Sequence, residues 1–270
     1  MISTDCIRLS RFAFVIFNVM LVSVASANVA LAQQDLPSAE QLLDKYAEAM
    51  GGSAFQEIKS RKITGTFRAD IAGHNINATI VYQDVAPNKR HLAFTGDVMS
   101  FVRVTNGEQV WEWRAASHGR DESTEFKSGQ VADLFRMSAC LAAPLKWRDL
   151  YKEVKTLGLE EVEERPAYKV QAKTQPGEEL IMFFDKENGR LVKQVRNLTS
   201  AAGEYPVEVL LLDYKKIDGV WMAMRRSETH HLPGFEPGQQ VWQFDEVVHD
   251  VDVPEALFEV PEELSKSDKQ

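Results

Sequence analysis

The sequence contains little cysteine and no excess of basic residues. Only Cys6 and Cys140 occur in 270 residues, too few for a disulfide-stapled scaffold or for a zinc site built from a cysteine cluster. The chain has 40 Asp and Glu against 31 Lys and Arg, which gives a formal net charge of −9. This acidic balance argues against docking on anionic lipid or on phosphate backbones by bulk electrostatics, so we expect no nucleic-acid partner.

The sequence also lacks the short motifs of common enzymes: the Gly-x-Ser-x-Gly elbow, the phosphate loop, the dinucleotide-binding glycines and His-Glu-x-x-His. The densest group of metal-ligating side chains contains His230, His231 and His249. Adjacent residues of a strand point to opposite faces, so His230 and His231 fit solvated positions better than one metal site. Cys140 lies among apolar residues, which is typical of a buried structural thiol. We expect no catalytic residue, metal or cofactor, and a metal-dependent hydrolase built on the three histidines is the least favoured alternative.

The N-terminal residues have the form of a secretory signal peptide. Arg8 and Arg11 precede an uncharged stretch, residues 12–32, whose end Ala30-Leu31-Ala32 fits a peptidase site. We predict that residues 1–32 are removed and that residues 33–270 form a single mature domain. The alternative is a retained membrane anchor, because the stretch could just span a bilayer. No cysteine stands at the predicted start for lipid attachment, so we expect a soluble, exported, periplasmic protein.

One helix is predicted near the start of the mature chain. Ser38 and Gln41 have the spacing of a capping box. Apolar residues then recur at helical spacing between Ala39 and Met50, before Gly51-Gly52 ends the pattern. A second short helical turn is expected over residues 54–59.

From Ser60 onward the hydrophobic pattern has period two and is punctuated by turn signals such as Asn106-Gly107 and Asn188-Gly189. About a dozen antiparallel strands in chain order indicate a mainly β protein with one large meandering sheet, curled because so wide a sheet does not stay flat. The predicted strands are 61–70, 76–84, 90–95, 100–105, 109–115, 151–159, 167–173, 179–185, 190–198, 206–214, 220–230 and 240–248.

Residues 128–150 interrupt the strands with a pattern of short helices and loop that is too apolar for a solvated linker. The segment could cross the concave face of the sheet as a lid, or it could cover an edge strand and protect it from aggregation. The residue pattern leaves both interpretations open. The lid candidates are Leu134, Phe135, Leu141 and Leu145.

Several strands are apolar on both faces, whereas a half-buried antiparallel strand needs only one apolar face. The functional interpretation is an apolar cavity between the sheet and its helical cover, open to an acyl chain. The alternative is a filled core made of the same residues. The candidate lining residues are Phe67, Ile80, Trp111, Trp113, Met182 and Phe184.

The chain resembles bacterial outer membrane lipoprotein-sorting proteins, the LolA/LolB-like group. The resemblance rests on residues 41–52 of the predicted helix, on Thr64-Gly65-Thr66-Phe67, on Phe184-Asp185 with Asn188-Gly189-Arg190-Leu191, on residues 213–220 and on residues 253–258. It implies an open half-barrel of about eleven antiparallel strands with a helical lid over an apolar cavity. It also implies an arginine that latches the lid, but no residue of this chain matches that arginine, so none is assigned.

Two hypotheses about function follow from the resemblance and the predicted export. The first is a soluble periplasmic carrier or binding protein that shelters the acyl chains of a lipoprotein or lipid. The second is a periplasmic sensor or scaffold that binds a protein partner, located at the membrane, through the same concave face. The absence of an attachment cysteine argues against the membrane-anchored acceptor of this group.

Overall fold

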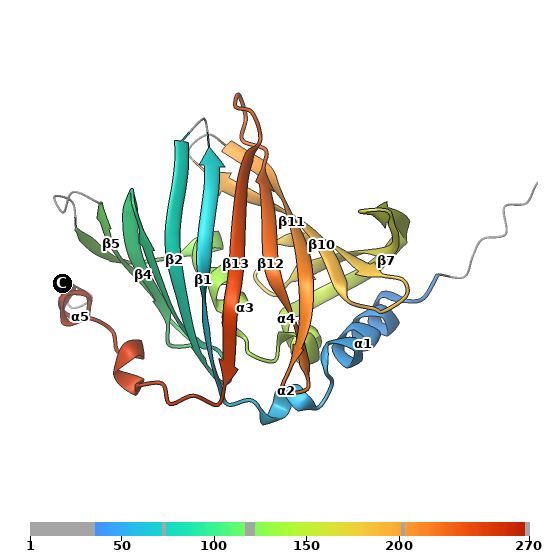
Figure 1. Ribbon diagram of the computed structural model, residues 1–270, viewed down its shortest axis with the longest axis horizontal. Helices are drawn as coiled ribbons and strands as arrows, with labels where there is room; N and C mark the ends of the chain where they lie inside the picture. The colour runs from blue at the N-terminus through green and yellow to red at the C-terminus, as the bar shows by residue number, and fades with distance from the viewer. Residues whose placement is uncertain (1–35, 72–73, 117–121, 201–202, 268–270) are drawn as a thin grey trace, which may run out of the picture. The chain divides into compact units, whose positions relative to one another are not determined.

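Antiparallel strands form most of the structure, as the period-two pattern predicts. The computed structural model describes residues 36–71, 74–116, 122–200 and 203–267, and the predicted signal peptide lies outside them. Thirteen strands of the described residues form one sheet in the order β6-β5-β4-β3-β2-β1-β13-β12-β11-β10-β9-β8-β7 (Figure 1). The edge strands β6 and β7 do not pair with each other within the described residues. The predicted fold class, a mainly β, open and curled antiparallel sheet with a few helices, is confirmed.

All twelve predicted strands are present, and one more, β6, was missed. It is only four residues long and its sequence, Ser-Thr-Glu-Phe, gives no hydrophobic alternation. The bounds of the strands are β1 Ser60–Ile71, β2 His74–Val85, β3 Lys89–Gly96, β4 Met99–Thr105, β5 Val110–Ala116, β6 Ser123–Phe126, β7 Tyr151–Val162, β8 Arg165–Thr174, β9 Glu179–Asp185, β10 Leu191–Ser200, β11 Gly203–Ile217, β12 Val220–His230 and β13 Gly238–His249.

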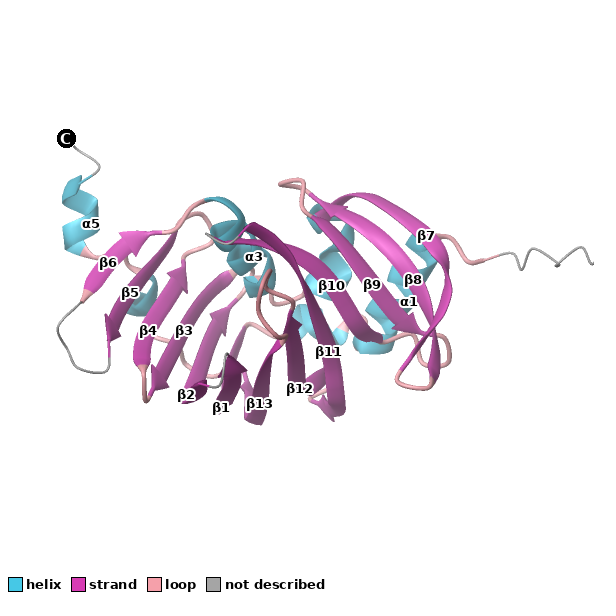
Figure 2. Cartoon of the chain, turned by 90° about the horizontal axis from the view of Figure 1, so that it is seen from above, coloured by secondary structure: helices cyan, strands magenta, loops and turns pink. Residues whose placement is uncertain are grey.

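The strand order determines the course of the segment between β6 and β7. Strands β1 to β6 run outward to one edge, strands β7 to β13 run inward from the other, and β1 pairs with β13 in the middle. The chain must therefore travel from one edge of the sheet to the other. It does so through α3 (Gly129–Ala139), η1 (Ala143–Lys146) and α4 (Trp147–Leu150), which lie on the concave side of the curl (Figure 2). Of the two interpretations left open for residues 128–150, the one in which the segment crosses the concave face is correct.

The N-terminal helix α1 (Ala39–Met50) has its predicted bounds, and the Ser38–Gln41 capping box is present with both of its hydrogen bonds. The helix buries Leu42 and Leu43 against Met182 and Phe184 of β9. It thereby covers the part of the sheet around β8 and β9, next to the part that α3 covers (Figure 2). The helical turn after it, α2 (Ala54–Glu57), is shorter than expected.

A glycine allows the two halves of the sheet to meet closely. The β1–β13 pairing shifts register between Thr64 and Gly65, and such a bulge bends a strand and increases its twist. A Cβ atom at Gly65 would lie 2.1 Å from the backbone oxygen of Gln243. Because that contact is with backbone, a side chain at this position would force the strands apart.

The outer face of the sheet near β3 to β6 is covered by the C-terminal residues, which form η2 (Glu255–Phe258) and α5 (Glu262–Ser267). Phe258 and Leu264 pack there with Val104 and Trp111. In the described part of the chain, every helix is too short or too polar to span a bilayer.

Candidate functional site

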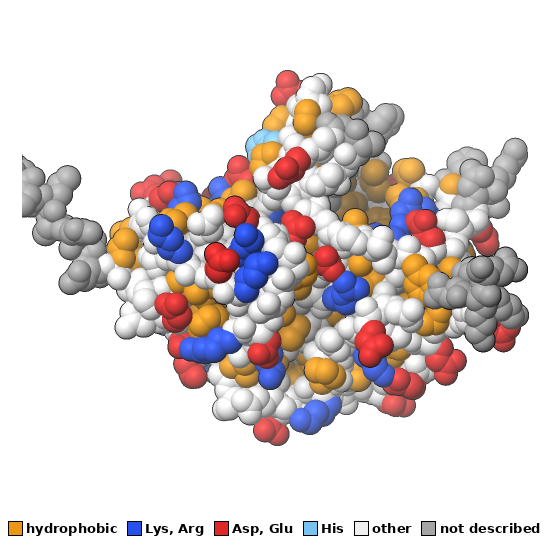
Figure 3. Space-filling view, turned by 180° about the vertical axis from the view of Figure 1, so that it is seen from behind, with side chains coloured by type: hydrophobic (Ala, Val, Ile, Leu, Met, Phe, Trp, Pro, Cys, Tyr) orange, Lys and Arg blue, Asp and Glu red, His pale blue; other side chains and the backbone are white. Residues whose placement is uncertain are grey.

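A cavity of about 500 Å³ lies between α3 and the concave face of the sheet. Its walls come from β2, β3, β4, β9, β10, β11, β12 and β13 on one side, from the first residue of β7, and from the α3 segment on the other. Both apolar and polar side chains line it: Tyr82, Arg90, Leu92, Arg103, Gln130, Val131, Leu134, Phe135, Met137, Ser138, Ala143, Leu150, Tyr151, Leu180, Gln194, Arg196, Leu198, Thr199, Tyr205, Arg226 and Trp242. The surface on the side of the helices is hollowed and mixes hydrophobic side chains with charges of both signs (Figure 3).

Helix α3 supplies an apolar roof. Val131, Leu134, Phe135 and Met137 all line the cavity, and their spacing places them toward one side of the helix. Phe135 is 7% exposed and also packs into the main core cluster. The roof is therefore both part of the core and part of the cavity wall.

The first turn of α3 is bound to β10 through one side chain. The Gln130 amide nitrogen donates to the Asn197 carbonyl oxygen over 2.9 Å, and the Thr199 backbone N–H donates to the Gln130 amide oxygen over 2.9 Å. The same amide nitrogen donates to a Glu178 carboxylate oxygen over 2.7 Å. One glutamine thus replaces a strand partner for β10 and holds the start of α3 over that side of the cavity.

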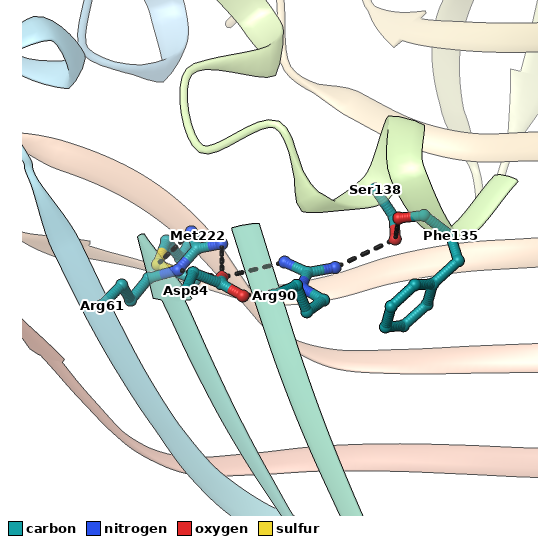
Figure 4. Close-up of polar contacts among 6 residues, drawn as sticks. All are labelled: Arg61, Asp84, Arg90, Phe135, Ser138 and Met222. Atoms are coloured by element: carbon teal, nitrogen blue, oxygen red, sulfur yellow. Dashed lines mark hydrogen bonds and ion pairs between the residues drawn. The ribbon is translucent and has the colours of Figure 1, made fainter. Parts of the chain in front are cut away.

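The last turn of α3 is bound to β3. Arg90 donates from Nη1 to the Ser138 hydroxyl oxygen over 3.0 Å, and the Ser138 hydroxyl donates to the Phe135 carbonyl oxygen over 2.8 Å (Figure 4). Helix α3 is therefore attached at one end to β10 and at the other to β3, across the width of the cavity.

A buried carboxylate holds Arg90 in place. Asp84 is fully buried, accepts from Nε and Nη2 of Arg90 at 2.6 and 2.9 Å, and accepts from Arg61 at 2.6 Å (Figure 4). Burial raises the pKa of Asp84, but the two guanidinium groups outweigh burial and the net pKa is lowered. Since Asp84 pairs with Arg61 across β1–β2 and with Arg90 across β2–β3, the sheet register itself assembles the cluster.

A second cluster lies across the cavity on β10 and β12. Glu228, 4% exposed, has Arg226 Nε at 2.7 Å, His230 Nε2 at 3.3 Å and Arg196 Nη2 at 3.9 Å. Burial raises the pKa of Glu228, but Arg226, His230 and Arg196 together lower it to about 2. Burial also lowers the pKa of Arg196, and the attraction of the Glu228 carboxylate, 3.9 Å away, only partly offsets this effect.

The structure places the predicted site residues in five locations. Leu134 and Phe135 line the cavity. Phe67 and Ile80 lie in the main core cluster below it, where Phe67 contacts Trp242 with ring centroids 4.7 Å apart.

Met182 and Phe184 are buried under α1, beside the cavity rather than in it. Leu141 packs with Met50 and Phe55 near the end of α1, and Leu145 packs against the same cluster. These residues fill core positions around the cavity.

Trp111 and Trp113 share a face of β5, but it is the outer face. Trp111 is 3% exposed and packs with Phe258 and Leu264 of the C-terminal segment. Trp113 pairs across strands with Val102, which packs against that same cluster. Their expected place in the cavity is wrong, because the alternation shows which residues share a face but not which element covers it.

A second hollow, of about 680 Å³, lies between α1, α4, β7 and β8. Its lining is dominated by charged residues of both signs: Glu40, Arg148, Lys152, Glu153, Lys155, Lys173 and Glu179. Such a lining is typical of a solvated surface groove. The cavity under α3 combines an apolar roof with polar and basic groups on the sheet side, and this combination has the character of a ligand pocket.

The histidines considered for a metal site lie against separate carboxylates. His230 contacts Glu228, whereas His249 Nδ1 lies 3.0 Å from Asp218. In the described residues, no three His, Cys, Asp or Glu side chains are arranged to hold a metal ion. Cys140 is half-buried, and burial raises the pKa of its thiol.

Comparison with solved structures identifies the architecture. No known protein family and no curated protein matches the chain by sequence. A LolA superfamily protein from Nitrosomonas europaea superposes with a TM-score of 0.56 at 13% identity, over 83% of this chain and 99% of that one. This chain has a LolA-like fold.

Two further structures have the same LolA-like fold. A domain named for outer membrane lipoprotein sorting, from Vibrio parahaemolyticus, has a TM-score of 0.55 at 12% identity and covers 82% of this chain and 97% of its own. A protein of the DUF1329 family from Desulfovibrio piger has a TM-score of 0.57 at 12% identity with the same coverage. At these identities the likeness establishes the fold alone.

Sequence reasoning missed the arginines of the cavity. Charged residues within strands, such as Arg90 and Arg196, were not among the predicted site residues. A signal for Arg90 was present, because the turn at Pro87-Asn88 places Asp84 opposite it in a hairpin. No comparable local signal links Arg196 with Arg226 and Glu228, which belong to strands separated in the sheet by β11.

Proposed function

We propose that this protein is an exported, periplasmic carrier or binding protein that shelters the acyl chain of a lipoprotein or lipid under α3. The observation that carries the proposal is the cavity between an apolar roof and a LolA-like sheet. The signal-peptide form of residues 1–32 supports export. The naming of one structural neighbour for lipoprotein sorting supports a lipid-modified cargo.

The size and lining of the cavity fit this role. Its volume of about 500 Å³ lies within the range of about 300–1,000 Å³ typical of small-molecule pockets. Leu92, Leu180 and Leu198 of the sheet and Leu134 and Phe135 of α3 line it. Each CH2 group of an alkyl chain moved from water into such surroundings contributes about 0.8 kcal/mol, so a partly inserted chain is held firmly.

The attachment of α3 fits exchange of the cargo. Helix α3 is bound to the sheet by the Gln130 and Ser138 hydrogen bonds and by the packing of Ala132 and Phe135. Each hydrogen bond contributes only about 0.5–1.5 kcal/mol net. Opening the roof therefore costs far less than unfolding the sheet, and this lets a bound chain leave.

The test is to purify the protein from its native host without detergent, extract it with organic solvent and identify bound molecules by mass spectrometry. We expect stoichiometric lipid or acylated peptide. Leu134→Trp, which places an indole in the cavity, should abolish the bound species. Leu157→Trp, at a position on β7 that is 42% exposed, is the matched control and should retain it.

A protein that carries no lipid and also fails to bind acylated peptides when they are supplied would overturn the proposal. Co-purification of a stoichiometric protein without lipid would favour the sensor or scaffold instead.

A further inference from the structure

The charge of the cavity is opposite to that of the whole chain. Four arginines line it, Arg90, Arg103, Arg196 and Arg226, and the described lining includes no Asp or Glu, although the chain carries a net charge of −9. The carboxylates that pair with these arginines, Asp84, Glu112 and Glu228, are 0%, 1% and 4% exposed, and none of them lines the cavity. The cavity therefore presents guanidinium groups on a wall whose other described residues are uncharged.

Two of the arginines are fully occupied by structural roles. Arg90 forms two hydrogen bonds to Asp84 and one to Ser138. Arg103 lies 2.5 Å from Glu112, and its guanidinium stands over the Phe135 ring at 5.6 Å. These two connect the sheet with α3 and keep their own carboxylates.

The other two arginines share a single carboxylate. Arg226 contacts Glu228 at 2.7 Å and stacks over the Trp242 ring at 4.6 Å, whereas Arg196 is 3.9 Å from Glu228. His230 also contacts this carboxylate. Two guanidinium charges against one carboxylate leave an excess positive charge at the β10–β12 side of the cavity.

Two buried hydrogen-bond donors without acceptors belong to side chains that line the cavity. The Nε–H of Arg196 and the indole N–H of Trp242 are buried, and neither has an acceptor among the described residues. Both side chains line the cavity. A buried donor without a partner is costly and rare in folded proteins, and an oxygen-rich anion bound at Arg196 would supply the acceptor that its Nε–H lacks and would balance the excess charge.

We infer that the cavity binds an amphiphile with an anionic head group, phosphate or carboxylate, held by Arg196 and Arg226 while its alkyl chain lies under α3. Guanidinium groups bind such oxyanions with paired, charge-assisted hydrogen bonds. The inference rests on the proposed function and specifies its ligand. Gln194, Thr199 and Tyr205 line the same side and add polar groups beside the head group.

The test uses amphiphiles with one alkyl chain and different heads: hexadecyl phosphate, palmitate, hexadecanol and hexadecyltrimethylammonium. Their affinities are measured by displacement of a fluorescent fatty acid from the delipidated protein. Inorganic phosphate alone is the arm that separates a lipid head group from a free anion. We expect the two anionic amphiphiles to bind about tenfold or more tightly than hexadecanol, as charge-assisted hydrogen bonds provide, and inorganic phosphate to displace nothing.

The variant Arg196→Gln should reduce the preference for anionic heads about tenfold and leave hexadecanol binding unchanged. Arg225→Gln is the matched control, because Arg225 is adjacent to Arg226 on β12, points to the opposite face and pairs with Asp213 at 2.9 Å. Arg196→Lys, which keeps the charge but not the paired donors, should retain part of the preference and serves if Arg196→Gln does not fold.

Equal affinity for hexadecanol and the anionic amphiphiles would overturn the inference and leave the carrier proposal standing. So would an equal effect of Arg225→Gln, or displacement by inorganic phosphate as effective as by hexadecyl phosphate. Failure of every alkyl compound to bind would instead overturn the carrier proposal itself, so the two failures are distinguishable.

Discussion

Arg90 on β3 donates a hydrogen bond to the hydroxyl of Ser138 on α3, 3.0 Å away, while its other donors bind the buried carboxylate of Asp84. Two nitrogens of the guanidinium group are therefore fixed to the sheet, and the third, Nη1, reaches the roof of the cavity (Figure 4). Because Arg90 is positioned by Asp84 whether or not Ser138 is bound, the contact with α3 is the weaker of the two.

Ser138→Ala removes this contact without disturbing Asp84. We expect a loss of about 0.5–1.5 kcal/mol in the free energy of unfolding, the net contribution of one hydrogen bond, and faster release of bound ligand. Chemical denaturation and stopped-flow displacement measure the two effects. Ser53→Ala, at an exposed residue before α2 whose side chain makes no capping bond, should change neither. Unchanged release in Ser138→Ala would show that this contact does not restrain the roof.

Acid should destabilise the protein through Glu228. Its pKa in the folded protein is lowered from 4.5 to about 2, where burial opposes the shift and Arg226, His230 and Arg196 outweigh it. A group whose pKa is lowered by folding contributes stability above its unfolded pKa, and this stability is lost as the pH falls through the folded pKa. The free energy of unfolding should therefore decline between pH 4.5 and about 2.

Glu228→Gln tests the assignment of this acid-sensitive range. The variant leaves Arg226 and Arg196 near each other without a counter-charge, so we expect a loss of about 3–5 kcal/mol at neutral pH and a shallower decline in acid. Part of the decline in the free energy of unfolding remains in the variant, since Asp84 also has a lowered pKa. Urea denaturation at a series of acidic pH values measures this free energy. Glu236→Gln, in the exposed β12–β13 connection, should keep the wild-type profile, and an unaltered profile in Glu228→Gln would contradict the assignment.

Gly65→Ala should be destabilising although it adds only one methyl group. The new carbon would lie 2.1 Å from the Gln243 carbonyl oxygen at the β1–β13 junction, so the backbone must move, and overpacking of this kind costs about 1–3 kcal/mol. Thermal unfolding measures the loss. Arg68→Ala, at an exposed position of the same strand, is the control. Equal stability of Gly65→Ala and the wild type would mean that the two halves of the sheet tolerate separation here.

The parts of the fold that depend on neighbours in sequence could be predicted, and those that depend on distant partners could not. The capping box and the apolar stripe gave α1 its correct bounds, and alternation located twelve strands. Alternation along a strand also places Trp111 and Trp113 on one face of β5. Only the position of Phe258, far along the chain, shows that this face is the outer one.

The cavity was the least predictable feature, because its polar residues come from strands that are distant in sequence. Arg196 belongs to β10 and Arg226 to β12, and they share Glu228 only after the sheet has formed. Leu134 and Phe135 could be predicted because the α3 segment is apolar and interrupts the strands. The sequence thus indicated the roof of the site but not the charged wall opposite it.

Gln130 should control how fast the cavity opens. Its amide makes two hydrogen bonds with the backbone of β10, at Asn197 and Thr199, and these join the start of α3 to the sheet. Gln130→Ala removes both of these bonds and the bond to Glu178, so we expect ligand to dissociate about tenfold faster, the effect of losing roughly 1–1.5 kcal/mol in the closed state. The association rate should rise or stay the same, because the closed roof no longer has to release these bonds first.

The measurement is stopped-flow exchange of a fluorescent fatty acid, with hydrogen exchange of the α3 amides as an independent readout. Faster ligand release together with lower protection of α3 would show that the helix moves as a lid. Gln56→Ala, at an exposed position of α2, is the matched control and should exchange ligand at the wild-type rate. Unchanged release combined with lower protection would mean that ligand leaves by another route, and the role of α3 as a gate would then be wrong.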